Sequence, residues 1–128
     1  MDSQAQELKA RTKSFALRII KLTRALPRCS EGRVIGNQLL RCGTSVAANY
    51  RAACRARSRT EFLAKLGVVV EEADETVFWL EMLSESGLVR KERLREIVPE
   101  ANELVAIFSA AQLTVKRGLQ SKIVPRTS

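Results

Sequence analysis

The sequence predicts an all-α protein, an antiparallel up-down-up-down four-helix bundle, and three observations support this prediction. Apolar residues recur at spacings of three and four along four segments, and no segment shows the alternation typical of a strand. Aromatic residues make up only 5% of the chain and hydrophobic residues 45%, which favours helices packed on helices over a sheet sandwich. The 128 residues suffice for one domain with a single core, and short connections favour antiparallel neighbours.

The first two helices are predicted at about residues 4–26 and 31–56. Pro27 ends the first helix, and Ser30 is a candidate N-cap for the second. The stripe of the first helix consists of Phe15, Ile19, Leu22 and Leu26, and that of the second consists of Ile35, Leu39, Cys42, Val46, Asn49 and Ala53. Gly43 costs about 1 kcal/mol relative to alanine inside a helix. We therefore expect it to mark a close helix crossing, within the bundle or between subunits.

The third and fourth helices are predicted at about residues 59–86 and 90–117. Ser58 and Glu61 have the spacing of a capping box, and Gly87 suits the C′ position. Pro99 lies inside the fourth segment and predicts either a kink or a short helix to Val98 with a fresh start at Pro99. Residues 1–118 are expected to form one domain and residues 119–128 a flexible tail.

The positive charge is concentrated in the first half of the chain. The net charge is +8, but residues 1–60 carry 13 basic and 3 acidic residues, whereas residues 61–128 carry 9 basic and 11 acidic ones. Two kinds of partner fit this distribution: a polyanion on the basic side, or other copies of the chain paired plus to minus.

Five arginines around the second helix are the candidates for polyanion contact. They are Arg41, Arg51, Arg55, Arg57 and Arg59. On a continuous helix, Arg41, Arg55 and Arg59 would lie within about 40° of one line that small residues otherwise occupy. Arginine forks match phosphate oxygens, and because aromatic platforms are missing, the contacts are expected to be independent of base sequence. The alternative is an ordinary solvated helix end, where arginine favours the macrodipole.

The third helix has more apolar surface than one bundle core requires. Val68, Trp79 and Met82 lie on a side separate from its inward face, with Phe78 at the margin. These four residues are the predicted oligomer interface, because tryptophan and methionine are enriched at protein–protein contacts. The alternative is that the fourth helix or the tail covers them.

The residues for enzyme chemistry are lacking, so we expect a protein that is not an enzyme and needs no metal or cofactor. The chain contains no histidine, and Cys29, Cys42 and Cys54 form no CxxC motif. The acidic run EEADE, residues 71–75, is predicted to be a solvated face or a partner for arginines of a neighbouring copy. No apolar run approaches the roughly 20 residues of a membrane span, and no signal peptide is recognised, so a cytoplasmic location is expected.

Two motifs resemble a known family. QLLRCGTSVAANYRAACRARSRTEF, residues 38–62, and EEADETVFWLEML, residues 71–83, are similar to the bacterial four-helix bundle proteins encoded in intervening sequences of 23S ribosomal RNA genes. The resemblance implies a ring-like homo-oligomer, a pentamer around a central channel. It extends to the accessory protein of diversity-generating retroelements, a basic pentamer that binds nucleic acid and a reverse transcriptase.

Two functions follow as hypotheses. The leading one is a non-enzymatic homo-oligomer that binds RNA or DNA through phosphate contacts, by analogy through the five arginines. The alternative is a protein-interaction scaffold, for example accessory to a reverse transcriptase, whose basic and acidic faces bind subunits or partners.

Overall fold

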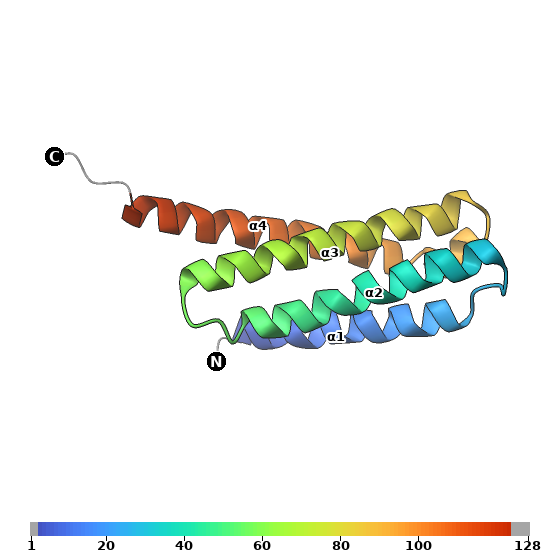
Figure 1. Ribbon diagram of the computed structural model, residues 1–128, viewed down its shortest axis with the longest axis horizontal. Coiled ribbons are helices and arrows are strands. Elements are labelled where there is room, and N and C mark those ends of the chain that lie inside the picture. Colours follow the sequence, from blue (N-terminus) through green and yellow to red (C-terminus); the bar gives the residue numbers. More distant parts are fainter. Residues whose placement is uncertain (1–2, 124–128) are drawn as a thin grey trace.

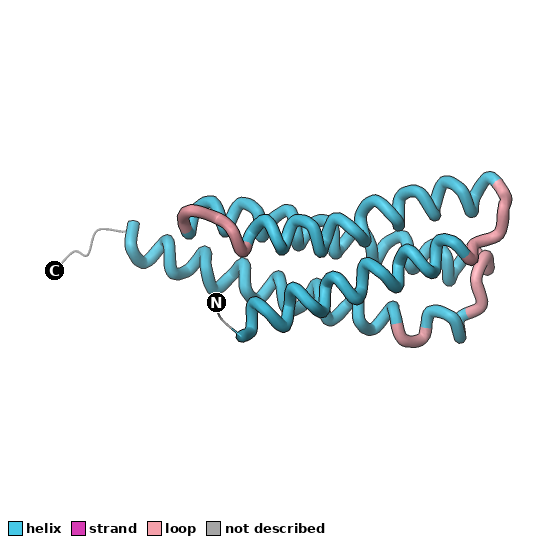
Figure 2. The backbone as a smooth tube through the Cα atoms, turned by 90° about the horizontal axis from the view of Figure 1, so that it is seen from below, coloured by secondary structure: helices cyan, strands magenta, loops and turns pink. Residues whose placement is uncertain are grey.

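The computed structural model describes residues 3–123, with side chains to residue 121, as four long helices and one short 3-10 helix. They are α1 Ser3–Arg24, α2 Ser30–Ala53, α3 Arg59–Glu85, η1 Lys91–Leu94 and α4 Ile97–Ile123. No strand occurs in this part of the chain. Consecutive helices run antiparallel and pack side by side, so the predicted up-down-up-down bundle describes the fold (Figure 1; Figure 2).

Both ends of α2 differ from the prediction. The helix starts at Ser30, so Cys29 rather than Ser30 is the N-cap, and no side chain caps it. The helix ends at Ala53, because the backbone N–H groups of Arg55 and Ala56 turn to the carbonyls of Ala52 and Ala53, three residues back. Residues 54–58 therefore form a connection, and the straight line of arginines expected to continue to Arg59 does not exist.

The predicted fourth helix is split. The short helix η1 ends at Leu94, and α4 starts at Ile97, so the chain starts afresh two residues earlier than Pro99. Pro99 lies in the first turn of α4 and precedes the first backbone bond of that helix, from Glu100 N–H to the Glu96 carbonyl at 3.4 Å. Its missing N–H therefore costs the helix no hydrogen bond.

At its other end α4 extends further than expected. It continues to Ile123, so residues 119–123, which were assigned to the tail, are helical. The rest of the predicted tail, residues 124–128, lies outside the described residues.

The core runs the length of the bundle and contains the predicted stripes with few changes. In α2, Tyr50 rather than Asn49 is buried, with 5% of its surface exposed, and its ring centroid lies 5.0 Å from that of Phe108. Asn49 is half-buried and donates to the Ser45 carbonyl at 2.9 Å. The largest fully buried side chains include Phe15, Ile19, Leu39, Leu66, Leu80, Leu83, Leu104 and Phe108.

The α1 and α2 helices cross closely at Gly43. A Cβ atom at this position would lie 2.9 Å from Cγ1 and Cγ2 of Ile19 in α1, closer than side chains normally approach. The predicted close crossing is therefore confirmed, and it lies within the chain. Gly87, with a φ of 77°, follows the C-cap Ser86 of α3, as its predicted C′ position requires.

Ion pairs connect α1 to α4. The Arg11 guanidinium forms two hydrogen bonds to the Glu100 carboxylate, at 2.8 and 2.7 Å, and lies 2.9 Å from Glu103. Arg18 lies 4.0 Å from Glu96. The hydrogen bonds from Arg11 hold the pKa of Glu100 below its usual value. No helix among residues 3–123 is long and apolar enough to cross a membrane.

Candidate nucleic-acid interface

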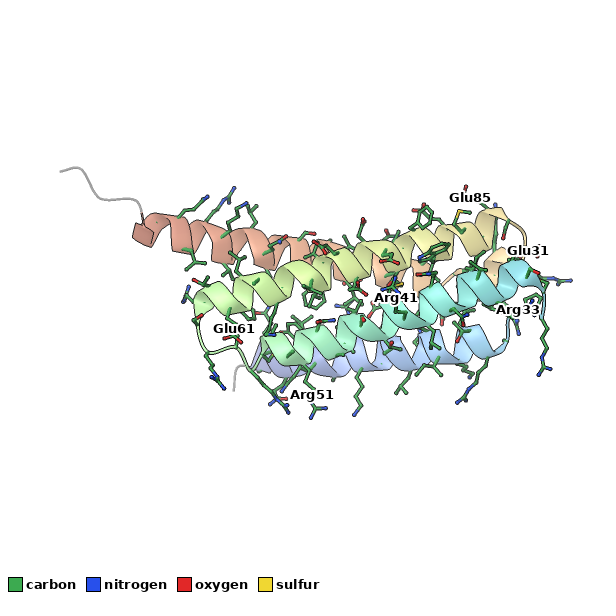
Figure 3. The ribbon with its side chains drawn as sticks, in the orientation of Figure 1. Glu31, Arg33, Arg41, Arg51, Glu61 and Glu85 are labelled. Atoms are coloured by element: carbon green, nitrogen blue, oxygen red, sulfur yellow. The ribbon has the colours of Figure 1, made fainter. Side chains whose placement is uncertain are left out.

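Four of the five candidate arginines gather where α2 gives way to α3. Arg51 lies in the last turn of α2, Arg55 and Arg57 lie in the connection, and Arg59 is the first residue of α3. The short connection keeps them at one end of the bundle, opposite the end that carries Arg33 (Figure 3). We call the group formed by Arg51, Arg55, Arg57 and Arg59 the basic end.

A capping box holds the backbone of this connection. The Ser58 hydroxyl accepts from the Glu61 N–H at 3.0 Å, as predicted, and the Glu61 carboxylate accepts from the backbone N–H of Arg57 at 3.1 Å. This carboxylate bonds to a peptide group and not to a guanidinium. The cap therefore fixes the loop while leaving the neighbouring arginine side chains available.

The arginines of the basic end are exposed and form no ion pair with any described residue. Glu61, the one acidic residue in the first turn of α3, is engaged in the cap. Four guanidinium groups therefore concentrate at one end of the molecule with little acid to neutralise them. Such a surface attracts polyanions and can donate paired hydrogen bonds to phosphate.

Arg41, the fifth candidate, lies in a different environment. Its guanidinium pairs with Glu72 at 3.3 Å and with Glu75, both in α3, and donates to Gln38 at 3.0 Å (Figure 3). The prediction that the EEADE run is either solvated or paired with another copy is wrong for these two glutamates, because they hold an arginine of their own chain. Arg41 therefore links α2 to α3 and lies outside the basic end.

The fold adds two basic residues that the sequence analysis did not select. Lys116 and Arg117 lie in the last third of α4. A Cβ atom placed on the neighbouring Gly118 would lie 3.6 Å from Nη1 of Arg59. The antiparallel course of α4 thus brings a second positive segment beside the basic end. No local signal marks these residues, because the juxtaposition depends on helix lengths.

Two of the cations of α1 are neutralised by ion pairs. Arg11 pairs with Glu100 and Glu103 of α4, and Arg18 pairs with Glu96, which directly precedes α4. At the opposite end of the bundle, basic residues are interspersed with acids, as the labelled Glu31, Arg33 and Glu85 illustrate (Figure 3). A hollow of about 480 Å³ there is lined by both signs, from Arg18, Lys21, Arg93, Arg95, Glu92 and Glu96. The cations at this end are therefore accompanied by carboxylates, whereas those of the basic end have few carboxylates beside them.

The predicted oligomer interface is an apolar patch on α3, which we call the α3 patch. Phe78 is 49% exposed, Val68 40% and Met82 38%, so neither α4 nor any other described segment covers them. Trp79 is half-buried, donates from Nε1 to Glu75 at 3.2 Å, and lies edge-on to Phe78 with centroids 4.9 Å apart. The alternative in which the fourth helix buries this surface is wrong for these three exposed residues.

The cysteines and the acidic residues form no cluster suited to a metal ion in the described part of the chain. Within the described residues no three histidine, cysteine, aspartate or glutamate side chains lie together as a metal ion would require. Cys29, Cys42 and Cys54 are free thiols, and burial raises the pKa of Cys42, which is enclosed in the core.

The chain is similar to a known protein family and to a solved structure. A family model described as 23S rRNA-intervening sequence protein matches residues 5–110. A crystal structure of a Bacteroides thetaiotaomicron protein of unknown function, from the S23 ribosomal protein family, is 34% identical with a TM-score of 0.76. That match covers 81% of this chain and 96% of the other. No curated protein matches the chain significantly.

Proposed function

Because the chain belongs to the 23S rRNA-intervening sequence protein family, we propose that it is a non-enzymatic cytoplasmic homo-oligomer that binds nucleic acid through phosphate contacts at its basic end. The carrying observation is that Arg51, Arg55, Arg57 and Arg59 are exposed and without ion pairs among the described residues. Guanidinium groups held near one another but unneutralised repel each other. A polyanion relieves that repulsion and releases its own counterions.

Binding to a structured RNA and to duplex DNA across a salt series tests this proposal. We expect the affinity for at least one of them to fall linearly on logarithmic axes as salt rises. Replacing Arg55 and Arg57 together by glutamine should reduce the slope by about 0.9 for each duplex phosphate that the variant no longer neutralises. The difference between RNA and DNA identifies the preferred nucleic acid.

Two arginine variants provide matched controls. Arg41→Gln removes a guanidinium already paired with Glu72 and Glu75, and Arg33→Gln removes one at the opposite end of the bundle. Both are expected to leave the salt slope unchanged. No binding at low salt, binding indifferent to salt, or equal losses in all variants would each contradict the proposal.

The alternative function, a scaffold for subunits or protein partners, is favoured by the α3 patch. Exposed Phe78 and Met82 with half-buried Trp79 suit a protein contact. The two functions are compatible if the α3 patch joins subunits and the basic end binds the polyanion. We propose this division of roles, with the pentamer of related proteins as the expected assembly.

A further inference from the structure

An open apolar groove lies beside the basic end. It has a volume of about 950 Å³ and extends between the first turns of α1 and the second half of α4. Ion pairs from Arg11 and Arg18 hold α1 against α4 and the residue before it, and neither arginine lines the groove. The groove therefore lies along the part of the α1–α4 contact that has no ion pair among the described residues. Its half-buried wall residues are therefore partly open to solvent, while Phe108 below them is fully buried.

The walls of the groove are apolar and partly aromatic. Leu8 of α1, Phe62 of α3 and Ile107 of α4 are half-buried wall residues, and the paired rings of Tyr50 and Phe108 lie beneath them. From the sequence alone, aromatic platforms for bases were expected to be missing. In the fold the Phe62 ring reaches the groove, so an aromatic surface borders the basic end after all.

Cations form the rim of the same groove. Arg57 and Arg59 line it together with Ser58, and neither arginine has an ion pair among the described residues. An occupant must therefore combine a flat or apolar body with an adjacent negative charge. A nucleotide in a single strand has this combination, since its base can unstack while its phosphate stays on the backbone. A duplex does not, because its bases are already stacked and paired.

We propose that the groove receives an unstacked base of single-stranded nucleic acid while Arg57 and Arg59 hold the adjacent phosphate. This inference rests on the proposed function and narrows its ligand to single strands or to unpaired segments of a folded RNA. Aromatic and apolar contacts with a base are tolerant of its identity, so the preference concerns strandedness and not sequence.

Three fluorescently labelled oligonucleotides of one sequence test the inference with the full chain. They are a single strand, the same strand with abasic sites, and the duplex. We expect the intact strand to bind roughly tenfold more tightly than the abasic strand, the effect of one stacked base. The duplex should bind through its phosphates alone.

Two substitutions connect the preference to the groove. Ala111→Leu adds volume inside the groove, and the matched control Ala106→Leu adds it on an exposed part of α4 outside the groove. Ala111→Leu should remove the difference between intact and abasic strands, and Ala106→Leu should retain it. Phe62→Leu, which keeps an apolar side chain but removes the ring, should reduce the difference if the first variant folds poorly.

The outcomes separate this inference from the proposed function. Equal binding of all three probes would overturn the groove assignment and leave phosphate binding intact. No binding of any probe would overturn both. If Ala111→Leu changes the oligomer size without changing the probe preference, the groove holds a second copy of the chain and the assignment is wrong.

Discussion

At the scale of single residues, Arg41 and Arg55 illustrate how surroundings divide side chains of one type. Both lie in the segment that carries the family motif, and sequence reasoning grouped them together. Arg41 neutralises two glutamates 31 and 34 residues away in the sequence, whereas Arg55 lies in a connection and has no ion pair with any residue between 3 and 121. A guanidinium in an ion pair must give up that pair before it can bind phosphate, so the two residues cannot contribute equally to polyanion affinity.

The Arg11–Glu100 pair predicts a pH-dependent contribution to stability. Its hydrogen bonds lower the pKa of Glu100, so the contribution is complete above the usual glutamate pKa and disappears as pH falls through the lowered value. Glu100→Gln should therefore reduce the free energy of unfolding by about 1 kcal/mol at neutral pH. At about pH 2 the variant and the original chain should be nearly equal. Urea unfolding at both pH values measures the difference.

Glu96→Gln is the matched control for this prediction. Glu96 lies one turn earlier, its side chain is 88% exposed, and its pair with Arg18 is 4.0 Å long. An exposed pair of this kind contributes little. A loss at Glu96 as large as that at Glu100, or a loss at Glu100 that persists in acid, would show that the bidentate pair does not stabilise the seam.

At the scale of helices, the Gly43 crossing determines how closely α2 approaches α1. Gly43→Ala should destabilise the fold by about 1–3 kcal/mol, because the new methyl group collides with the buried Ile19 side chain. This loss opposes the gain in helix propensity, which is about 1 kcal/mol. Thermal or urea unfolding measures the sum. Shortening the neighbour in a Gly43→Ala, Ile19→Val double variant should recover part of the loss.

Gly67→Ala provides the comparison within the same molecule. A methyl group at Gly67 would lie 3.4 Å from the end of the flexible Gln112 side chain, an ordinary contact. This variant should be as stable as the original chain or slightly more stable. If Gly43→Ala stabilises the protein as Gly67→Ala does, the crossing tolerates a larger residue and the close approach is not required.

Helix positions followed from the sequence better than helix ends did. Periodicity reports which face is buried, and capping residues such as Ser58 and Glu61 fixed the start of α3. Periodicity does not report where backbone bonding changes from four residues back to three, and this change ends α2 at Ala53. Pro99 indicated a break but not its place, because proline is accepted throughout the first turn of a helix.

At the scale of the whole molecule, the surroundings of the basic end depend on how the chain folds back on itself. The local arginine density was visible in the sequence, but the pairing of Arg41, the proximity of Lys116 and Arg117, and the groove depend on contacts between distant segments. The arginines of the candidate site could therefore be predicted from the sequence, but their surroundings could not. The residues of the α3 patch and their common side of the helix could both be predicted, since one helix carries all of them.

The assembly predicted for the molecule depends on the α3 patch. Light scattering of the purified chain should give the mass of a homo-oligomer, with a pentamer expected from the family. Phe78→Glu should reduce it to monomers, because it places a charge in the apolar contact. Leu113→Glu, at another exposed position on α4, is the control and should leave the mass unchanged. A monomeric original chain, or equal effects of both variants, would contradict a role for the α3 patch.

The seam between α1 and α4 also has a consequence for how the molecule opens and closes. Each of the other neighbouring pairs is consecutive in sequence and packs closely, whereas this pair joins the two ends of the chain, packs less extensively and is linked by guanidinium–carboxylate bonds. Contacts so local in sequence favour rapid folding, with α4 docking as a separable unit. In native-state hydrogen exchange, amides in the second half of α4 should exchange through partial opening of the bundle. Amides of α2 should exchange only through global unfolding. Uniform protection of both helices would mean that the bundle opens only as a whole.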